Sequence, residues 1–241
     1  MERIVLISGG SRGIGYSMAE KFAMDKQTTV VITARRLEQL QKAVEEIKKS
    51  TGNDNVHFFQ CNFTNMKEIQ KLADDVQAKW GRVDVLVNNV ALSLQFGPTL
   101  EIPESSYDKM MVGNIKSYFF TIQTFLKLIP KKTSSSIILI SSYLGLRPEP
   151  MVGIYSVTKT ALNSLTIVLS KELLNTGIRV NCVAPGLIKT DFSKPLWEKG
   201  SSRKIGMPED VAELVYFLCS DKAKFINGAI VPICGAPVGC L

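Results

Sequence analysis

The feature that most constrains the fold of this 241-residue chain is an alternation of short β-branched segments with longer amphipathic segments. In the first half, helices that begin near residues 14, 37 and 66 separate predicted strands at 4–8, 29–33, 56–60 and 83–87. The second half continues with a helix around 107–128, strands at 136–140, 179–183 and 230–233, and helices around 154–174 and 209–219. Such an alternation is typical of a parallel sheet with helical crossovers.

Two of the predicted strands, 83–87 and 136–140, are mostly apolar without alternation, as expected for strands that helices cover on both faces. Because crossovers between parallel strands are right-handed, the pattern predicts a Rossmann-like, doubly wound α/β fold with seven parallel strands. The length fits one domain over residues 1–241. The segment 189–207 contains Pro195, Gly200, Ser201 and Ser202, and we expect it to be a loop over the substrate site.

Several features bear on the compartment of the protein. Every apolar run is far shorter than the roughly 20 residues of a membrane-spanning helix, so no membrane insertion is expected. The predicted strand that begins at Ile4 leaves no room for a signal peptide. The five cysteines form an odd set without a C-x-x-C pair, which favours a reducing compartment. We therefore expect a cytoplasmic protein, with a peroxisomal or mitochondrial location as an alternative.

Neither a metal nor a nucleic acid is a predicted ligand. His57 is the only histidine, and no clustered cysteines or carboxylates accompany it. The formal net charge of +7 raises nucleic acid as a partner, but the basic residues are dispersed and the densest run, Lys131-Lys132, lacks interleaved aromatic residues. A polyanionic small ligand accounts for part of the excess positive charge.

The first predicted strand runs into a glycine-rich turn, Ser8-Gly9-Gly10-Ser11-Arg12-Gly13-Ile14-Gly15. Glycines let the backbone turn sharply and approach a pyrophosphate at the N-terminus of the following helix. An ordinary tight turn is the alternative, but the position between a first strand and a helix favours a dinucleotide. We expect Gly9, Ser11, Arg12, Gly13, Ile14 and Gly15 to contact the cofactor.

The second predicted strand ends in Thr33-Ala34-Arg35-Arg36, where an acidic residue would bind the ribose diol of NAD. Arg35 can instead make a bidentate contact with a 2′-phosphate. Arg12 in the glycine turn could approach the same phosphate from the other side, and Arg36 is a further candidate contact. The alternative is that these arginines are surface residues at the start of a helix. The pattern favours NADP(H) over NAD(H).

Tyr155 and Lys159 are four residues apart in a predicted helix, so they share one face. A lysine charge near the phenol favours the phenolate, and we expect it to lower the tyrosine pKa from about 10 toward neutrality. Tyr155 would then give or take a proton during hydride transfer. Most tyrosine–lysine pairs at this spacing have only a structural role, which is the alternative here.

Three further segments support a site at the carboxyl edge of the sheet. Ser142 follows a buried strand and could hydrogen-bond a substrate oxygen, although a turn or capping serine is the alternative. Asn114 lies within a predicted helix, where asparagine is unfavourable unless its side chain binds something, and a kink or a bound water would suit it. The run from Pro185-Gly186 to Thr190 could set a backbone edge and a hydroxyl against a nicotinamide, or be a plain loop.

Taken together, these motifs resemble the short-chain dehydrogenase/reductase family in its short single-domain branch. The residues that carry the resemblance are Gly9, Gly13, Gly15, Asn88-Asn89, Asn114, Ser142, Tyr155, Lys159 and Pro185-Gly186, in the family's order and over nearly the whole chain. The segments 184–190, 192–193 and 196–197 are most similar to NADPH-dependent carbonyl reductases of the peroxisomal and cytosolic group that acts on ketones, dicarbonyls and retinoids.

The resemblance implies a role for each of four residues. Tyr155 would be the general acid/base, Lys159 would lower its pKa and bind the nicotinamide ribose, Ser142 would steady the substrate oxygen, and Asn114 would hold a water. It also implies NADP(H) as cofactor, frequent homotetramers or dimers, and further cofactor contacts from Asn62, Asn88, Pro185, Gly186, Ile188 and Thr190.

The sequence departs from the family pattern at several points. Asn88-Asn89-Val90-Ala91 replaces Asn-Asn-Ala-Gly, and Asn62 stands where an aspartate usually contacts the adenine. Pro232 lies in a segment that replaces the usual Asp-Gly-Gly, which puts the C-terminal subunit contact in doubt. Residues 239–241 lack the basic residue of a peroxisomal address.

The leading hypothesis is an NADPH-dependent reductase of ketones, dicarbonyls or aldehydes, reversible in principle. Two alternatives are a 3-oxoacyl-[acyl-carrier-protein] reductase, whose positive charge would attract an acidic carrier protein, and a non-catalytic NADP(H)-binding sensor. The predicted substrate contacts are the side chains beside the reacting oxygen and the loops 92–96 and 192–197. Those side chains are Tyr143, Leu144, Met151 and Leu187.

Overall fold

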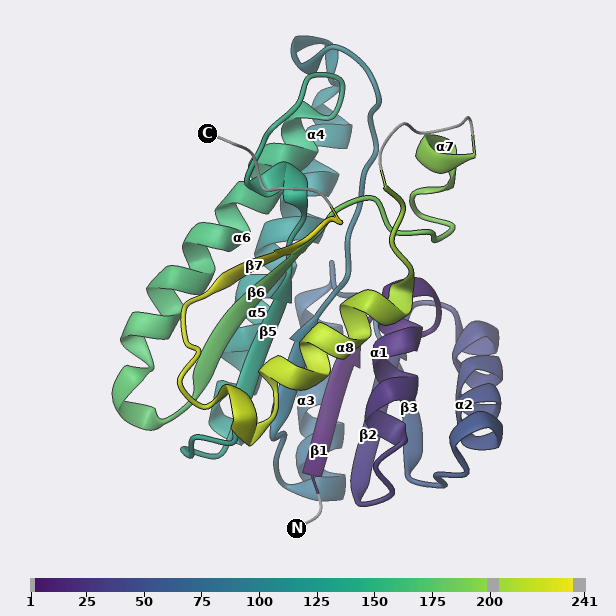
Figure 1. Ribbon diagram of the computed structural model, residues 1–241, viewed down its shortest axis with the longest axis vertical. Helices are drawn as coiled ribbons and strands as arrows, with labels where there is room; N and C mark the ends of the chain where they lie inside the picture. The colour runs from purple at the N-terminus through teal and green to yellow at the C-terminus, as the bar shows by residue number, and fades with distance from the viewer. Residues whose placement is uncertain (1–2, 199–203, 236–241) are drawn as a thin grey trace.

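A computed structural model describes residues 3–198 and 204–235 of the chain. Seven strands form one parallel sheet in the order β3-β2-β1-β4-β5-β6-β7 (Figure 1). The strands are β1 (Arg3–Ser8), β2 (Thr28–Ala34), β3 (Val56–Gln60), β4 (Val85–Asn88), β5 (Ser136–Ile140), β6 (Arg179–Pro185) and β7 (Ile230–Ile233). This is the Rossmann-like, single-domain α/β fold that the sequence predicts.

Helices cover both faces of the sheet, which explains why its central strands are apolar throughout. The helices are α1 (Gly13–Ala23), α2 (Leu37–Thr51), α3 (Met66–Trp80), α4 (Glu104–Met111), α5 (Ser117–Phe125), α6 (Gly153–Glu172), α7 (Lys194–Trp197) and α8 (Pro208–Leu218). Side chains of α1, α2 and α8 pack on one face, and those of α3, α5 and α6 pack on the other. Alternate residues of β1 supply the two cores, with Val5 and Ile7 on the first face and Ile4 and Leu6 on the second.

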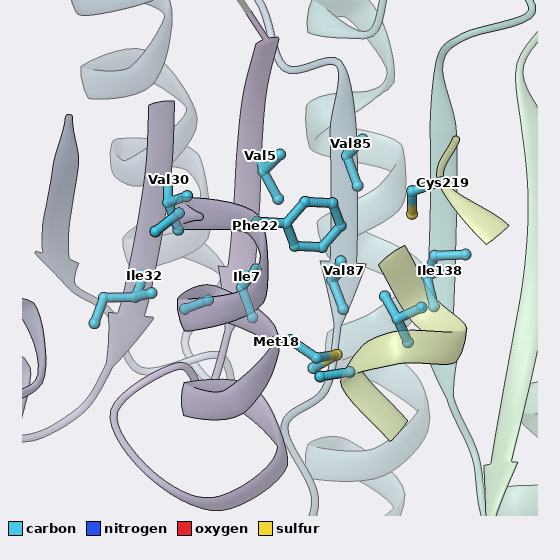
Figure 2. Close-up of a cluster of buried hydrophobic side chains, with 14 of the residues drawn as sticks. Val5, Ile7, Met18, Phe22, Val30, Ile32, Val85, Val87, Ile138 and Cys219 are labelled. Carbon is cyan, nitrogen blue, oxygen red and sulfur yellow. The ribbon is translucent and has the colours of Figure 1, made fainter. Parts of the chain in front are cut away.

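One of the two cores lies between α1 and the sheet. Met18 and Phe22 of α1 face the sheet, where they lie among Val5, Ile7 and Val87 (Figure 2). Phe22 is completely buried. Removing a fully buried aromatic side chain of this kind typically costs about 3–5 kcal/mol, so this core fixes the position of α1 on the sheet.

The structure differs from the sequence prediction in three elements. β4 begins at Val85 rather than at residue 83, because the Val83 amide donates to the Leu128 carbonyl and not to a neighbouring strand. The predicted helix 107–128 is divided into α4 and α5 by a π-helical turn, Val112–Lys116. The predicted loop 189–207 contains the one-turn helix α7 and an isolated bridge between Ile188 and Gly206, and its residues 199–203 lie outside the described part.

The strand order reverses between β1 and β4, which are neighbours in the middle of the sheet. In a doubly wound fold, the crevice that binds ligands opens outside the carboxyl ends of the strands at this point. The ends of β1, β4, β5 and β6 therefore mark where a site is expected. Within residues 3–198 and 204–235, no helix has both the length and the apolarity to cross a membrane.

Candidate active site

A cavity of about 1390 Å³ opens at the carboxyl edge of the sheet. It is lined by most of the predicted site residues, which come from six separate segments of the chain. These are Gly9, Ser11, Arg12, Gly13, Ile14, Arg35, Arg36, Asn62, Ser142, Tyr143, Leu144, Tyr155, Lys159, Pro185, Gly186, Leu187, Ile188 and Thr190. Four predicted residues do not line it: Gly15, Asn88, Asn114 and Met151.

The glycine turn has the backbone geometry that an anion site needs. Gly9 and Gly13 have φ angles of +69° and +56°, which L side chains rarely adopt. A Cβ on Gly13 would lie 3.2 Å from Cγ2 of Thr190. Arg12 is the N-cap of α1, and neither a capping side chain nor an acidic residue occupies the first turn. The free amides of this helix N-terminus therefore face a cradle suited to a phosphate.

Gly15 does not line the cavity and is packed closely within the turn. A Cβ on this residue would overlap the Gly9 carbonyl oxygen and lie 2.8 Å from Nδ2 of Asn89. Gly15 is buried and allows the close packing of the turn on itself, and its contact with a cofactor stays a prediction.

Asn88 does not line the cavity but the neighbouring Asn89 does, and the Asn88 cofactor contact stays a prediction. Asn88 is 2% exposed at the end of β4, whereas Asn89 lines the cavity. The Asn89 amide donates to Oγ of Ser8 at 2.9 Å, and its Nδ2 donates to the Ser8 carbonyl at 3.1 Å. Successive side chains of a strand point to opposite faces, and this alternation was the signal that could have separated the two asparagines.

The end of β2 presents an exposed cationic surface to the cavity. Arg35 and Arg36 are exposed, and Arg36 is the N-cap of α2 without a capping side chain. Nε2 of Gln60 donates to the Arg35 carbonyl at 2.7 Å, which fixes the backbone there. Arg12 approaches from the glycine turn and forms an ion pair of 3.4 Å with Asp191.

Asn62 lines the cavity in a fixed orientation. Its Oδ1 accepts hydrogen bonds from the amide of Thr64 at 3.2 Å and from the Thr64 hydroxyl at 2.9 Å. The Asn62 amide in turn donates to Glu68 at 2.7 Å. The turn after β3 is therefore preorganised, with the amide side chain held at the cavity wall.

Ser142 and Tyr155 meet at the centre of the cavity. Ser142 is the second residue after β5, and its Oγ accepts a hydrogen bond of 3.2 Å from the Leu144 amide, so the predicted turn serine and the predicted site serine are one residue. Burial raises the pKa of Tyr155 to about 12, and a hydrogen bond with Ser142 acts in the opposite direction. The expected shift of the Tyr155 pKa toward neutrality is therefore wrong for this state of the protein.

The position of Lys159 explains that result. Its Nζ donates to the Ile140 carbonyl at 2.9 Å and lies over the Tyr155 ring, 5.6 Å from the ring centroid. The side chain is 1% exposed, and burial lowers the Lys159 pKa to about 8. The helical spacing does bring the two residues together, but the ammonium hydrogen bond goes to a strand carbonyl.

Asn114 was predicted as a catalytic residue, and the structure places it behind the cavity wall. It is fully buried in the π-helical turn, the irregularity that the sequence analysis allowed for. Its Oδ1 accepts from the Leu92 amide at 2.7 Å, and its Nδ2 donates to the Leu92 carbonyl at 2.8 Å and to Oγ1 of Thr158 at 3.1 Å. Asn114 thus positions the cavity loop at Leu92 against α6, and its water-holding role stays a prediction.

The substrate side of the cavity is mainly apolar. Tyr143, Leu144 and Leu187 line it as predicted, together with Leu94, Phe96 and Leu196 of the two predicted loops. The Phe192 ring lies 6.2 Å from the Tyr155 ring, measured between centroids.

Met151 does not contribute to this wall. Its φ of 70° is the one positive value among the described non-glycine residues, and its carbonyl accepts a hydrogen bond from the Gly97 amide at 2.9 Å. The strained backbone turns Met151 away, and Val152 lines the cavity instead.

The segment after β6 is folded onto the glycine turn. Oγ1 of Thr190 lies 3.1 Å from Oγ of Ser193, and Nε1 of Trp197 donates to the Thr190 carbonyl at 3.1 Å. These contacts hold Thr190 against Gly13.

Sequence reasoning missed other cavity residues, among them Gln39, Thr64 and Lys204, because they belong to none of the motifs.

Comparisons with known proteins identify the family of the chain. A sequence model of the family described as "short chain dehydrogenase" matches residues 3–201. The "Dehydrogenase/reductase SDR family member 4" of Bos taurus is 32% identical over 253 residues, which cover 99% of this chain and 88% of that protein.

Two solved structures resemble the whole chain. The structure of ElxO with NADP bound has a TM-score of 0.88 at 33% identity, with 97% of both chains covered. A variant of actinorhodin polyketide ketoreductase with NADPH has a TM-score of 0.89 at 25% identity, with 97% and 96% of the chains covered. The chain therefore belongs to the short-chain dehydrogenase family.

Proposed function

We propose that this protein is an NADPH-dependent reductase of apolar ketones, dicarbonyls or aldehydes, with Tyr155 as the general acid. The observation that carries the proposal is that the Ser142 and Tyr155 side chains line the same cavity, with the buried ammonium of Lys159 over the Tyr155 ring. A phenol, a hydroxyl and a cation around one point are the groups that a carbonyl oxygen needs as it gains negative charge.

The cavity residues fit a dinucleotide with a 2′-phosphate. The glycine turn and the uncapped N-terminus of α1 would hold the pyrophosphate. A glycine is needed at position 13, because a Cβ there would crowd Thr190 at the floor of the cradle. Arg35 and Arg36 would bind the 2′-phosphate, and Asn62 lines the expected adenine end. That ElxO and the actinorhodin ketoreductase were solved with NADP and NADPH supports this choice.

The other predicted contacts follow from the same placement. Gly186, Ile188 and Thr190 line the cavity after β6, where they would meet the nicotinamide end. Bound NADPH would supply the hydride. Thr190 is held by Ser193 and Trp197, so its hydroxyl is preorganised for an amide contact.

The proton chemistry favours reduction. With a pKa of about 12, Tyr155 is protonated at neutral pH and ready to donate to the more basic alkoxide oxygen. Ser142 would donate to the same oxygen as negative charge develops on it. The positive charge of Lys159, 5.6 Å from the Tyr155 ring centroid, would stabilise the phenolate left behind.

The walls of the cavity indicate the substrate class. Leu94, Phe96, Leu144, Phe192 and Leu196 surround the approach to Tyr155 with apolar surface. The Phe192 ring beside the catalytic phenol would stack on a planar or aromatic substrate. Hydrophobic ketones, quinones and retinal-like aldehydes fit these walls better than small polar substrates.

The test is NADPH oxidation with diketones, quinones, aldehydes and retinal, with NADH in parallel and with the Tyr155→Phe variant. Turnover with NADPH that is lost in the variant supports the proposal. Tight NADPH binding without turnover on any of these carbonyls would refute it and favour the non-catalytic sensor. Phe192→Ala should weaken turnover of aromatic ketones more than that of short aliphatic ones.

A 3-oxoacyl-[acyl-carrier-protein] reductase is the second candidate. The net charge of +7 and the presence of Lys204 in the cavity wall favour an acidic, carrier-bound substrate. Comparing acetoacetyl thioesters on the carrier protein with free ketones separates the two activities. A strong preference for the carrier-bound form would select this alternative.

The homotetramer or dimer remains a prediction of the resemblance, and the cytoplasmic location remains a prediction from the sequence composition. Sedimentation equilibrium of the full chain tests the first, and imaging of the tagged protein tests the second.

A further inference from the structure

A second buried tyrosine, Tyr118, contacts the catalytic lysine. Tyr118 is on the first turn of α5, four residues after Asn114 and directly after the π-helical turn Val112–Lys116. It is 1% exposed, and its hydroxyl donates to the Ile140 carbonyl at 3.1 Å. The same carbonyl accepts the Lys159 ammonium at 2.9 Å, so the two side chains share one acceptor at the end of β5.

The Lys159 ammonium also lies over both tyrosine rings. Its Nζ is 5.5 Å from the ring centroid of Tyr118 and 5.6 Å from that of Tyr155. Both distances are within the roughly 6 Å at which an ammonium is attracted to an aromatic face. Water is excluded from this place, where such an attraction is stronger than at an exposed surface. The cation therefore has two aromatic neighbours and one strong acceptor.

We propose that Tyr118 is a positioning residue for the reaction, which holds the Lys159 ammonium beneath Tyr155 through its ring and through the Ile140 carbonyl that both side chains share. The inference rests on the proposed function, in which Lys159 supports proton transfer by Tyr155. It adds to that function a residue outside the cavity wall, supplied by a different helix from the one that carries Tyr155 and Lys159.

The groups that face Lys159 come from four elements. Tyr155 lies on α6 itself, Tyr118 on α5, the Ile140 carbonyl on β5 and the Cys182 thiol on β6. Burial raises the pKa of the Cys182 thiol to about 11 and that of Tyr118 well above its ordinary value, so both are neutral near pH 7. Since these neighbours are uncharged, the ring faces and the carbonyl have an unusual share in keeping the lysine protonated.

Tyr118 does not itself act as an acid or base. Its hydroxyl is directed at a backbone carbonyl, which cannot pass a proton on, and its ring is enclosed in the core with Ile122 and Phe125 of the same helix. The competing explanation is that Tyr118 only fills this core. A test must therefore separate the loss of the aromatic face from the loss of packing volume.

The experiment compares four variants of the full chain. Tyr118→Leu removes the ring and the hydroxyl, Tyr118→Met does so with a more adaptable side chain, and Tyr118→Phe removes the hydroxyl alone. Phe125→Leu is the matched control, because Phe125 is fully buried on the same helix and does not line the cavity. Each variant is assayed for kcat, KM and pH profile of NADPH-dependent reduction.

A second readout does not depend on turnover. The titration of Lys159 is followed in the protein without substrate by heteronuclear NMR of its Cε–Hε resonance, assigned with Lys159→Arg. Loss of the aromatic face should move this titration to lower pH in Tyr118→Leu and Tyr118→Met, but not in Phe125→Leu.

The expected result is a fall in kcat of about 3- to 30-fold in the two non-aromatic variants, from the usual strength of such contacts. The alkaline limb of the pH profile should move to lower pH, with a smaller change in KM for the carbonyl. Tyr118→Phe should recover most of the loss, because it keeps the ring.

Equal kcat, pH limb and Lys159 titration in Tyr118→Leu and Phe125→Leu would overturn the inference and leave Tyr118 as a core residue. A failure of the proposed function looks different. If the unsubstituted protein reduces no carbonyl, the NMR titration alone decides, and an unchanged Lys159 titration in the non-aromatic variants refutes the role of Tyr118.

Discussion

The Lys159 ammonium donates a hydrogen bond of 2.9 Å to the main-chain carbonyl of Ile140, and the lysine is only 1% exposed. The acceptor is a neutral carbonyl rather than a carboxylate, so the charge is buried without the strongest kind of partner. Such an arrangement costs stability and is expected where the charge serves a reaction.

Replacing Lys159 by methionine should therefore stabilise the folded protein near neutral pH. The folded pKa of about 8 is below the ordinary value of 10.5, so the cost of the buried charge is complete below pH 8 and disappears above pH 10.5. This lowering of the Lys159 pKa corresponds to roughly 3 kcal/mol. Urea unfolding at several pH values measures it. A variant that is less stable at pH 7, or a difference that does not change with pH, contradicts the prediction.

Tyr155→Phe should lower kcat by about 10²- to 10⁴-fold, because it removes the proton donor. NADPH binding should remain, since the ring and Lys159 stay in place. Fluorescence titration of NADPH and steady-state assays measure the two effects. Tyr216→Phe is the control, because Tyr216 packs against Phe22 far along the α1–α8 core and does not line the cavity. Residual activity close to that of the control would remove Tyr155 from its role.

The two directions of the reaction should respond oppositely to pH. Reduction needs the Tyr155 proton, which a pKa of about 12 retains, and the Lys159 charge, which is lost above its pKa of about 8. Reduction should therefore decline as the pH rises through 8. Alcohol oxidation needs the phenolate and should accelerate toward alkaline pH. Initial rates in both directions over this range provide the measurement, and parallel profiles would show that these two groups do not control it.

Arg35→Ala should weaken NADPH binding by about 10- to 100-fold, the usual effect of one lost charge-assisted contact. NADH lacks the 2′-phosphate, so its binding should change little. Lys49→Ala removes the same charge from the exposed last turn of α2 and serves as the control. An equal loss of NADH binding would mean that Arg35 does not meet the 2′-phosphate.

Gly15→Ala should abolish tight cofactor binding, because the added Cβ would overlap the Gly9 carbonyl and deform the turn. Gly97→Ala is the matched control, since its nearest neighbour would be 3.9 Å away. Calorimetric titration with NADPH and thermal unfolding of both variants separate a local effect from general instability. Unchanged affinity in Gly15→Ala would show that the turn tolerates the methyl group.

Local sequence pattern determined the architecture of this protein. The alternation of β-branched and amphipathic segments is sufficient for a parallel sheet, because helical crossovers and apolar strands leave few other arrangements. The glycine turn and the spacing of Tyr155 and Lys159 are equally local, since glycine conformation and helix periodicity depend on nearby residues alone. These features predicted the parts of the cavity wall that the glycine turn, Tyr155 and Lys159 form.

Contacts between distant segments decided which side chains reach the cavity and how the buried groups titrate. Asn114 turns toward Leu92, Asn89 rather than Asn88 reaches the cavity, and Met151 faces away, each through hydrogen bonds or packing with a segment far along the chain. The pKa values of Tyr155 and Lys159 follow burial, which the sequence spacing does not contain.

Tyr118 is the clearest case of this division. The sequence places it one helical turn after Asn114, but nothing in the spacing predicts that its hydroxyl and the Lys159 ammonium share the Ile140 carbonyl. Helix periodicity determines which side chains share a face, whereas the packing of α5 and α6 on β5 determines which acceptor and which ring the buried charge meets.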